Sequence, residues 1–116
     1  MSCSYSFTPD ILTEIQIPEK GILSHTLYND EQAKIVLFGF AAGEELTTHT
    51  APMPATIQIL SGEVTLTLGP DRREAAPGCL VHMQPQLTHS VTAKTPALVL
   101  LTLLKAARQD ANLQSG

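Results

Sequence analysis

The chain is built from short segments in which apolar and polar residues alternate. The clearest is Val64–Leu68, where Val64, Leu66 and Leu68 fall on one face of an extended chain and two threonines fall on the other. Such alternation is typical of a β-strand with one buried face. From alternation, or from apolar runs rich in β-branched residues, strands are predicted at 22–28, 34–40, 55–60, 64–68, 80–83, 90–93 and 97–104.

Turn-forming residues separate these segments about every 8 to 12 residues, the spacing of an all-β sandwich or barrel with about eight or nine strands. The predicted turns are 18–21, 29–31, 42–44, 61–63, 69–71, 77–78 and 94–96, and Arg72, Arg73 and Glu74 are expected at a solvated hairpin tip. Periodicity alone leaves open a jelly roll, a lipocalin-like barrel and an immunoglobulin-like sandwich. The lack of tryptophan and the cysteine spacing disfavour a true immunoglobulin domain.

Two predicted strands are more apolar than a small barrel requires. Segment 34–40 is nearly continuous in apolar residues, and segment 97–104 is interrupted only by Thr102. Apolar residues on both faces indicate a strand buried on both sides, either within one chain or in an interface. A homodimer is therefore expected, in which paired strands cover edges that would otherwise invite aggregation.

The length of 116 residues is that of one domain, expected to span 1–116. Within it we expect a barrel core at about 20–104, an N-terminal strand region at 1–19 and a tail at 105–116. A helical pattern is convincing only over 104–113, where it predicts a short tail helix or a frayed end.

Charge and targeting signals narrow the expected partners and compartment. The net charge is −4 and basic residues do not cluster, which disfavours nucleic acid and anionic membrane surfaces as partners. No apolar run approaches the ~20 residues that cross a bilayer, and residues 1–10 lack the features of a signal peptide. We therefore expect a cytoplasmic protein with reduced cysteines, Cys79 being a small buried residue.

The first cluster of candidate functional residues runs from Gly43 through His49 to Gly62. It resembles the first motif of the cupin family, written G-x5-H-x-H-x3–4-E-x6-G. Ala51 stands at the second histidine of that motif, and Ala55 stands at its glutamate. Side chains two residues apart on a strand share a face, so a His-x-His pair would form a two-ligand clamp, of which one half is missing here.

The second cluster begins at Gly78 and reaches His89 after ten intervening residues. It resembles the second cupin motif, G-x5-P-x-G-x2-H-x3-N. Gln84, Gln86 and Ala93 stand where that motif has its proline, glycine and asparagine. With the flanking strands, the resemblance spans residues 20–104 and is closest to the small single-domain cupins of bacteria.

The resemblance implies a double-stranded β-helix, or jelly-roll barrel, with a ligand pocket in its mouth. The pocket residues expected on this basis are His49, Ala51, Met53, Ala55, Met83 and His89, with the two alanines enlarging the cavity. The family holds its metal with three histidines and a glutamate, of which His49 and His89 remain. Since tight metal sites take three or four protein ligands, little or no tight metal binding is expected, with His82 or Glu45 as candidates to complete a weak site.

Two functions of different classes follow from these residues. The first is a cupin that binds an unidentified small molecule in a pocket around His49 and His89. The alternative is a metal-dependent cupin enzyme of the dioxygenase, isomerase or decarboxylase type. In that enzyme a divalent Zn, Ni, Fe or Mn ion would be held by the same two histidines and one compensating ligand. The sequence leaves open whether the protein is an enzyme.

Overall fold

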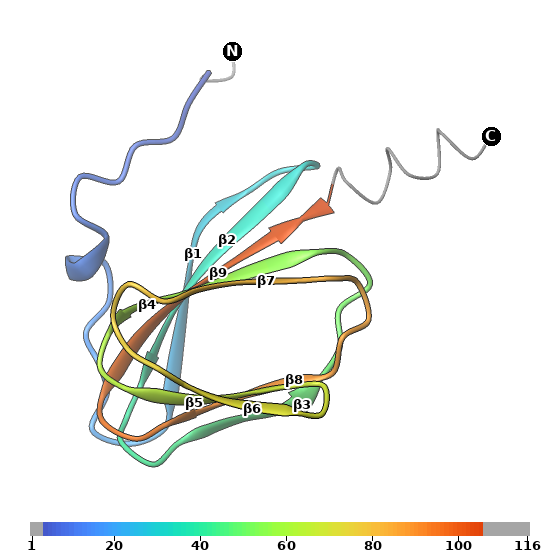
Figure 1. Ribbon diagram of the computed structural model, residues 1–116. Helices are drawn as coiled ribbons and strands as arrows, with labels where there is room; N and C mark the ends of the chain where they lie inside the picture. The colour runs from blue at the N-terminus through green and yellow to red at the C-terminus, as the bar shows by residue number, and fades with distance from the viewer. Residues whose placement is uncertain (1–3, 106–116) are drawn as a thin grey trace.

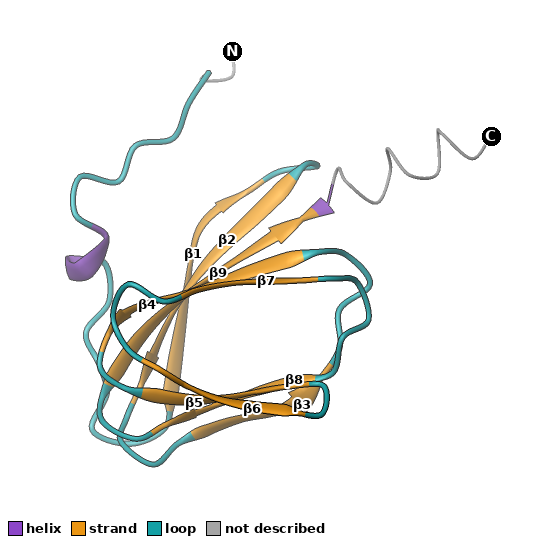
Figure 2. Ribbon diagram, viewed as in Figure 1, coloured by secondary structure: helices purple, strands orange, loops and turns teal. Residues whose placement is uncertain are grey.

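The computed structural model describes residues 4–105, which form two antiparallel sheets facing each other (Figure 1). Sheet A has the order β1-β2-β9-β4-β7, and sheet B has the order β3-β8-β5-β6. The strands are β1 (Ile22–Asn29), β2 (Ala33–Phe40), β3 (Glu45–His49), β4 (Ala55–Ser61), β5 (Val64–Leu68), β6 (Asp71–Ala75), β7 (Leu80–Met83), β8 (His89–Ala93) and β9 (Ala97–Leu104). The predicted jelly-roll barrel is confirmed, and Figure 2 shows how little helix the described chain contains.

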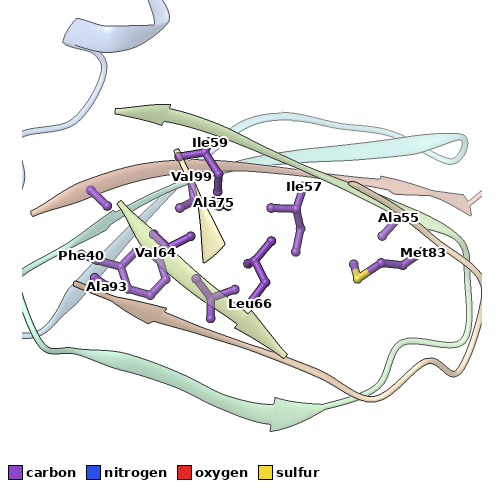
Figure 3. Close-up of a cluster of buried hydrophobic side chains, with 12 residues drawn as sticks. Phe40, Ala55, Ile57, Ile59, Val64, Leu66, Ala75, Met83, Ala93 and Val99 are labelled. Atoms are coloured by element: carbon purple, nitrogen blue, oxygen red, sulfur yellow. The ribbon is translucent and has the colours of Figure 1, made fainter. Parts of the chain in front are cut away.

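The hydrophobic core lies between the two sheets (Figure 3). Val64 and Leu66 of β5 are fully buried, as the alternation in their segment predicted, and they meet Ile57 and Ile59 of β4. Phe40 of β2 is also fully buried in this cluster. Each such side chain contributes about 1.5–3 kcal/mol by leaving water, so this layer is what holds the sheets together.

Two strands of the described chain lie outside the segments that the sequence pattern predicts. Arg72, Arg73 and Glu74 were expected at a hairpin tip, but they lie in β6, since Gly69 and Pro70 alone make the turn and Leu68 already pairs with Asp71. The charged residues of β6 occupy an edge of sheet B, where charge discourages further strand pairing. The other missed strand is β3, whose alternation is weak because three of its five residues are threonine or histidine.

The prediction of an N-terminal strand region at 1–19 is wrong for the residues of this range that the structure describes. Between Ser4 and Lys20 the structure contains a 3-10 turn, η1 (Ile11–Thr13), and no strand. The end of this segment, residues 15–18, passes over the outer face of sheet A, where Ile17 and Pro18 would come within 3.6 Å of a Cβ placed on Gly39. It packs face-on against the sheet instead of pairing at its edge, and the two prolines, Pro9 and Pro18, each lack an N–H for a strand ladder.

The predicted tail helix lies almost wholly outside the described residues, which end at Lys105. Within residues 4–105, no helix has the length and apolar character needed to cross a membrane.

Asp30 closes the turn between β1 and β2 by accepting three hydrogen bonds. One carboxylate oxygen accepts from the backbone N–H groups of Gln32 and Ala33, at 2.8 and 2.9 Å, and the other accepts from the hydroxyl of Tyr28. The bond from Tyr28, followed by those from the backbone, favours the ionised carboxylate and holds the pKa of Asp30 below its ordinary value.

We expect Asp30 to stabilise the protein in a pH-dependent way. A carboxyl group with a depressed folded-state pKa contributes stability above its ordinary pKa, and this contribution is lost as the pH falls through the folded-state pKa. The melting temperature of Asp30→Asn should therefore lie below that of the wild type at pH 7, and the gap should close below about pH 4. Glu31→Gln, an exposed neighbouring change, is the control. A gap that stays constant from pH 7 to pH 2 would contradict this role.

Candidate ligand-binding site

A small cavity lies between the sheets, with a volume of about 20 Å³. Sheet A and sheet B both contribute to its wall, which consists of Phe38, Phe40, Leu46, His49, Ile57, His89, Val91, Val99 and Leu101. This volume holds about one water molecule, whereas sites for drug-sized ligands measure about 300–1,000 Å³. A ligand of ordinary size must therefore lie mostly in front of the cavity or displace some of its apolar wall.

The two histidines of the motifs meet at this cavity. His49 ends β3, His89 begins β8, and the two residues pair directly across the strands. Their ring centroids are 4.2 Å apart, with the ring planes inclined at 59°. His89 is only 5% exposed, whereas His49 is exposed to solvent. The pair thus joins the buried apolar cavity to the surface of the molecule.

A β-bulge turns His49 toward the cavity. Leu46 pairs with Val91, and the next registered pair is His49 with His89, so β3 has one more residue than β8 between these points. In an unbroken ladder Thr48 would oppose His89, and the side chain of His49 would point to the outer face of sheet B. Bulges commonly re-aim a side chain beside a binding site, and this one creates the histidine pair.

Backbone carbonyls fix the orientation of both imidazole rings. Nδ1 of His49 lies 2.7 Å from the carbonyl oxygen of Thr47, and Nδ1 of His89 lies 2.9 Å from that of Leu87. A carbonyl oxygen only accepts, so each Nδ1 carries the proton and donates it. In the neutral rings each Nε2 consequently keeps its lone pair, which can accept a hydrogen bond or bind a metal ion.

The other expected pocket residues lie outside the cavity wall. Ala51 does not extend the strand of His49, because β3 ends at His49 and Pro52 and Pro54 follow in the loop. Met53 lies half-buried in the same loop. Thus Ala51 forms no strand clamp with His49.

Ala55 and Met83 do not enlarge the cavity either. They pair across β4 and β7, and each is 2% exposed within the hydrophobic core. Figure 3 shows the two side chains next to each other at one end of this core. The Met83 side chain packs beside the small alanine, and the space is therefore filled with core atoms.

The described residues do not complete a metal site around the pair. His82 is exposed and pairs with Thr56, on the face of sheet A opposite to Met83. Glu45 is exposed and neighbours Leu46, which lines the cavity, so its side chain points to the other face of sheet B. Between Ser4 and Lys105, no three His, Cys, Asp or Glu side chains come together in a way that could hold a metal ion. Two imidazoles alone are fewer than the three or four ligands of a tight site.

Neither a search of protein-family models nor a search of curated proteins finds a match to this chain. Solved structures, in contrast, resemble it closely. A conserved protein of unknown function from Streptococcus pyogenes has a TM-score of 0.79 and 26% identity, over 89% of this chain and 90% of that one.

Two further similar structures are identified as cupins. An RmlC-like cupin from Desulfovibrio desulfuricans has a TM-score of 0.78 and 25% identity, covering 87% of this chain and 98% of that one. A cupin superfamily protein from Desulfitobacterium hafniense has a TM-score of 0.78 and 23% identity, covering 81% of this chain and 86% of that one. By its sheet order and these likenesses, the chain has the double-stranded β-helix fold of these small bacterial cupins.

Proposed function

We propose that this protein binds a small molecule at His49 and His89. The observation that carries the proposal is the pair of Nε2 atoms left free by the two Nδ1–carbonyl hydrogen bonds, at the edge of an apolar cavity. Small-molecule sites commonly combine an apolar wall with a few fixed polar groups, and the pair has that form.

The chemistry of the pair favours a ligand that donates hydrogen bonds. Two neutral imidazoles with protonated Nδ1 atoms present acceptors at Nε2, which suit an O–H or N–H group of the ligand. A carboxylate offers only acceptors and would leave these atoms without partners. The cavity of about 20 Å³ accepts a group no larger than a methyl or a water, so we expect a neutral donor head at the histidines. The remainder of the ligand would lie over exposed His49.

A matched ligand series tests this proposal. Phenol and short-chain alcohols carry a donor, and anisole, the corresponding methyl ethers and acetate lack one. We expect binding of the donors, measured by NMR titration, and at least about tenfold weaker binding of the others, since one lost hydrogen bond costs ~1.5 kcal/mol.

The histidine variants locate the site. His89→Ala and His49→Ala should each weaken phenol binding by about tenfold, and His25→Ala, an exposed histidine of β1, should leave it unchanged. If phenol and anisole bind equally well, or if both histidine variants bind phenol like the wild type, the proposed function is wrong.

A metal-dependent enzyme is the second candidate, since the same free Nε2 atoms suit a divalent ion. The described residues supply only this pair, so we derive no catalytic step through a metal. Elemental analysis of tag-free protein separates the candidates. Near-stoichiometric Zn, Ni, Fe or Mn in the wild type, absent from both histidine variants, would favour the enzyme. Wild type without metal, and without thermal stabilisation by these ions, would favour the binding protein.

A further inference from the structure

Gln86 has a backbone conformation that its residue type disfavours. Its φ is +69°, and between Ser4 and Lys105 it is the one residue other than glycine with a positive φ. Five glycines occupy the remaining positions of this kind. In a left-handed conformation a side chain crowds the carbonyl that follows it, and strain of this type concentrates at functional sites. The position therefore calls for an explanation of why glycine is not used there.

The strain arises in the turn that joins β7 to β8. The N–H of Leu87 donates to the carbonyl of Gln84 at 3.4 Å, so residues 84–87 form a β-turn with Pro85 at its second position. Proline fixes a negative φ, and a positive φ at the third position is then the mark of a type II turn. Glycine is favoured at that third position because it has no side chain to crowd the backbone. Gln86 thus stands where glycine fits best, as it also stands where the second cupin motif has glycine.

No contact in the described part of the chain explains the glutamine. Its side chain is exposed to solvent and so gains no burial. Within residues 4–105, no side-chain hydrogen bond involves its amide. The turn itself uses backbone atoms, which glycine would supply equally well. Where a chain departs from its local rule without a structural gain, a functional contact is the expected reason.

The turn places Gln86 at the mouth of the histidine site. The backbone N–H of Gln86 donates to the carbonyl of Ala51 at 2.7 Å, which joins the turn to the loop that follows His49. The next residue, Leu87, supplies the carbonyl that orients His89. The β3–β4 and β7–β8 loops accordingly run side by side at the end of the barrel where the histidine pair lies (Figure 1). Gln86 therefore belongs to the rim over which the remainder of a ligand would lie.

The side-chain amide would supply a kind of hydrogen-bond donor that is scarce at this mouth. The Nε2 atoms of the histidine pair are acceptors. Pro52, Pro54 and Pro85 of the two loops have no N–H, and the backbone N–H of Gln86 is already bonded to Ala51. A glutamine amide carries two N–H donors that suit a carbonyl oxygen. We propose that Gln86 is a specificity-determining residue, whose side-chain amide donates a hydrogen bond to a carbonyl oxygen of the ligand.

The ligand class that follows has two polar ends. Its O–H or N–H head bonds to the histidines, and its carbonyl oxygen bonds to Gln86. The inference rests on the proposed function, since the head group anchors the ligand at the histidine pair. It adds a preference that the histidines alone would not create, because acceptors at Nε2 do not distinguish a ligand carbonyl from a methylene group of similar size.

NMR titration with matched phenols tests the proposal. The probes are the isomers of hydroxyacetophenone and the corresponding ethylphenols, in which a methylene group replaces the carbonyl. At least one hydroxyacetophenone should bind the wild type about tenfold more tightly than its ethylphenol. Gln86→Met keeps the length of the side chain and the strained turn but has no amide, so both probes should bind it equally. Gln58→Ala removes an exposed amide from the outer face of sheet A and, as the control, should keep the preference.

Gln86→Gly checks that the side chain is not needed by the fold. It should also lose the preference, and it should melt at the wild-type temperature or up to about 5 °C higher, because glycine relieves the turn. A lower melting temperature would show that the side chain supports the fold, and it would overturn the proposal. A preference that survives in Gln86→Met would do the same. A wild type that binds phenols without preferring the carbonyl contradicts this inference alone, whereas one that binds none of the probes contradicts the proposed function together with it.

Discussion

Replacing Gly62 with alanine is expected to destabilise the fold by about 2–5 kcal/mol. Gly62 has a φ of +79°, a left-handed conformation that alone costs an L-residue about 1–2 kcal/mol. A Cβ at this position would clash with the carbonyl oxygen of Pro96 and would lie 2.8 Å from the Cα of Ala97. Both atoms belong to backbone, and Ala97 begins β9 in the fully buried core, so relief requires moving a central strand.

Gly21→Ala is the matched control for this prediction. Gly21 has nearly the same φ, +80°, but a Cβ there would meet no atom within 4 Å. Its replacement should cost only the conformational strain of about 1–2 kcal/mol. Urea denaturation of the three proteins measures both effects. Equal losses for the two variants would show that the contact with Pro96 and Ala97 contributes nothing.

The same glycine shows why the fold was predictable from the sequence. Gly62 belongs to the motif because the turn from β4 to β5 needs both a left-handed residue and the absence of a side chain. Such requirements are local, and so is the alternation that placed Val64 and Leu66 in the core. Seven predicted strands correspond to observed ones, because each rests on a pattern within a few residues.

The candidate site was only partly predictable, since its geometry depends on contacts between distant segments. The sequence reading identified His49 and His89, and the structure brings them together. The sequence does not predict the bulge in β3, because the bulge depends on pairing with β8. It also does not predict that Ala55 and Met83 lie side by side, because this depends on pairing between β4 and β7. A one-residue difference in register moves a side chain to the opposite face of the sheet. The residues of the pocket wall could therefore not be predicted from the sequence.

The apolar wall of the cavity was also missed, although its residues lay in predicted strands. Phe38 and Phe40 alternate along β2 and face the cavity, while Leu37 and Gly39 lie on the opposite face, where the N-terminal residues 15–18 pass over Gly39. Because both faces of this strand are apolar, its sequence does not reveal which face is which. Only the observed fold, in which residues 15–18 pack over Gly39, assigns the phenylalanines to the interior.

Phe40→Ala is expected to cost about 3–5 kcal/mol of unfolding free energy, measured by urea denaturation. The ring is fully buried between the sheets, and its removal leaves a void that the close-packed β-strands can only partly fill. Phe7→Ala removes the same group from a side chain that is 77% exposed, and it should change stability by no more than about 0.5 kcal/mol. Losses of similar size in the two variants would contradict the assignment of Phe40 to the core.

The void links this stability effect to the histidine pair, because Phe40 also lines the small cavity beside His49 and His89. Removing the ring should enlarge that cavity, and an enlarged apolar cavity can take up an apolar guest. We therefore expect benzene to raise the melting temperature of Phe40→Ala and to leave the wild type unchanged. If Phe40→Ala is too unstable to purify, Phe40→Leu should show a smaller loss and a smaller benzene effect. A void that benzene does not stabilise would mean that the strands collapse around the missing ring, and the wall of the site would then be compliant enough to reshape around a ligand.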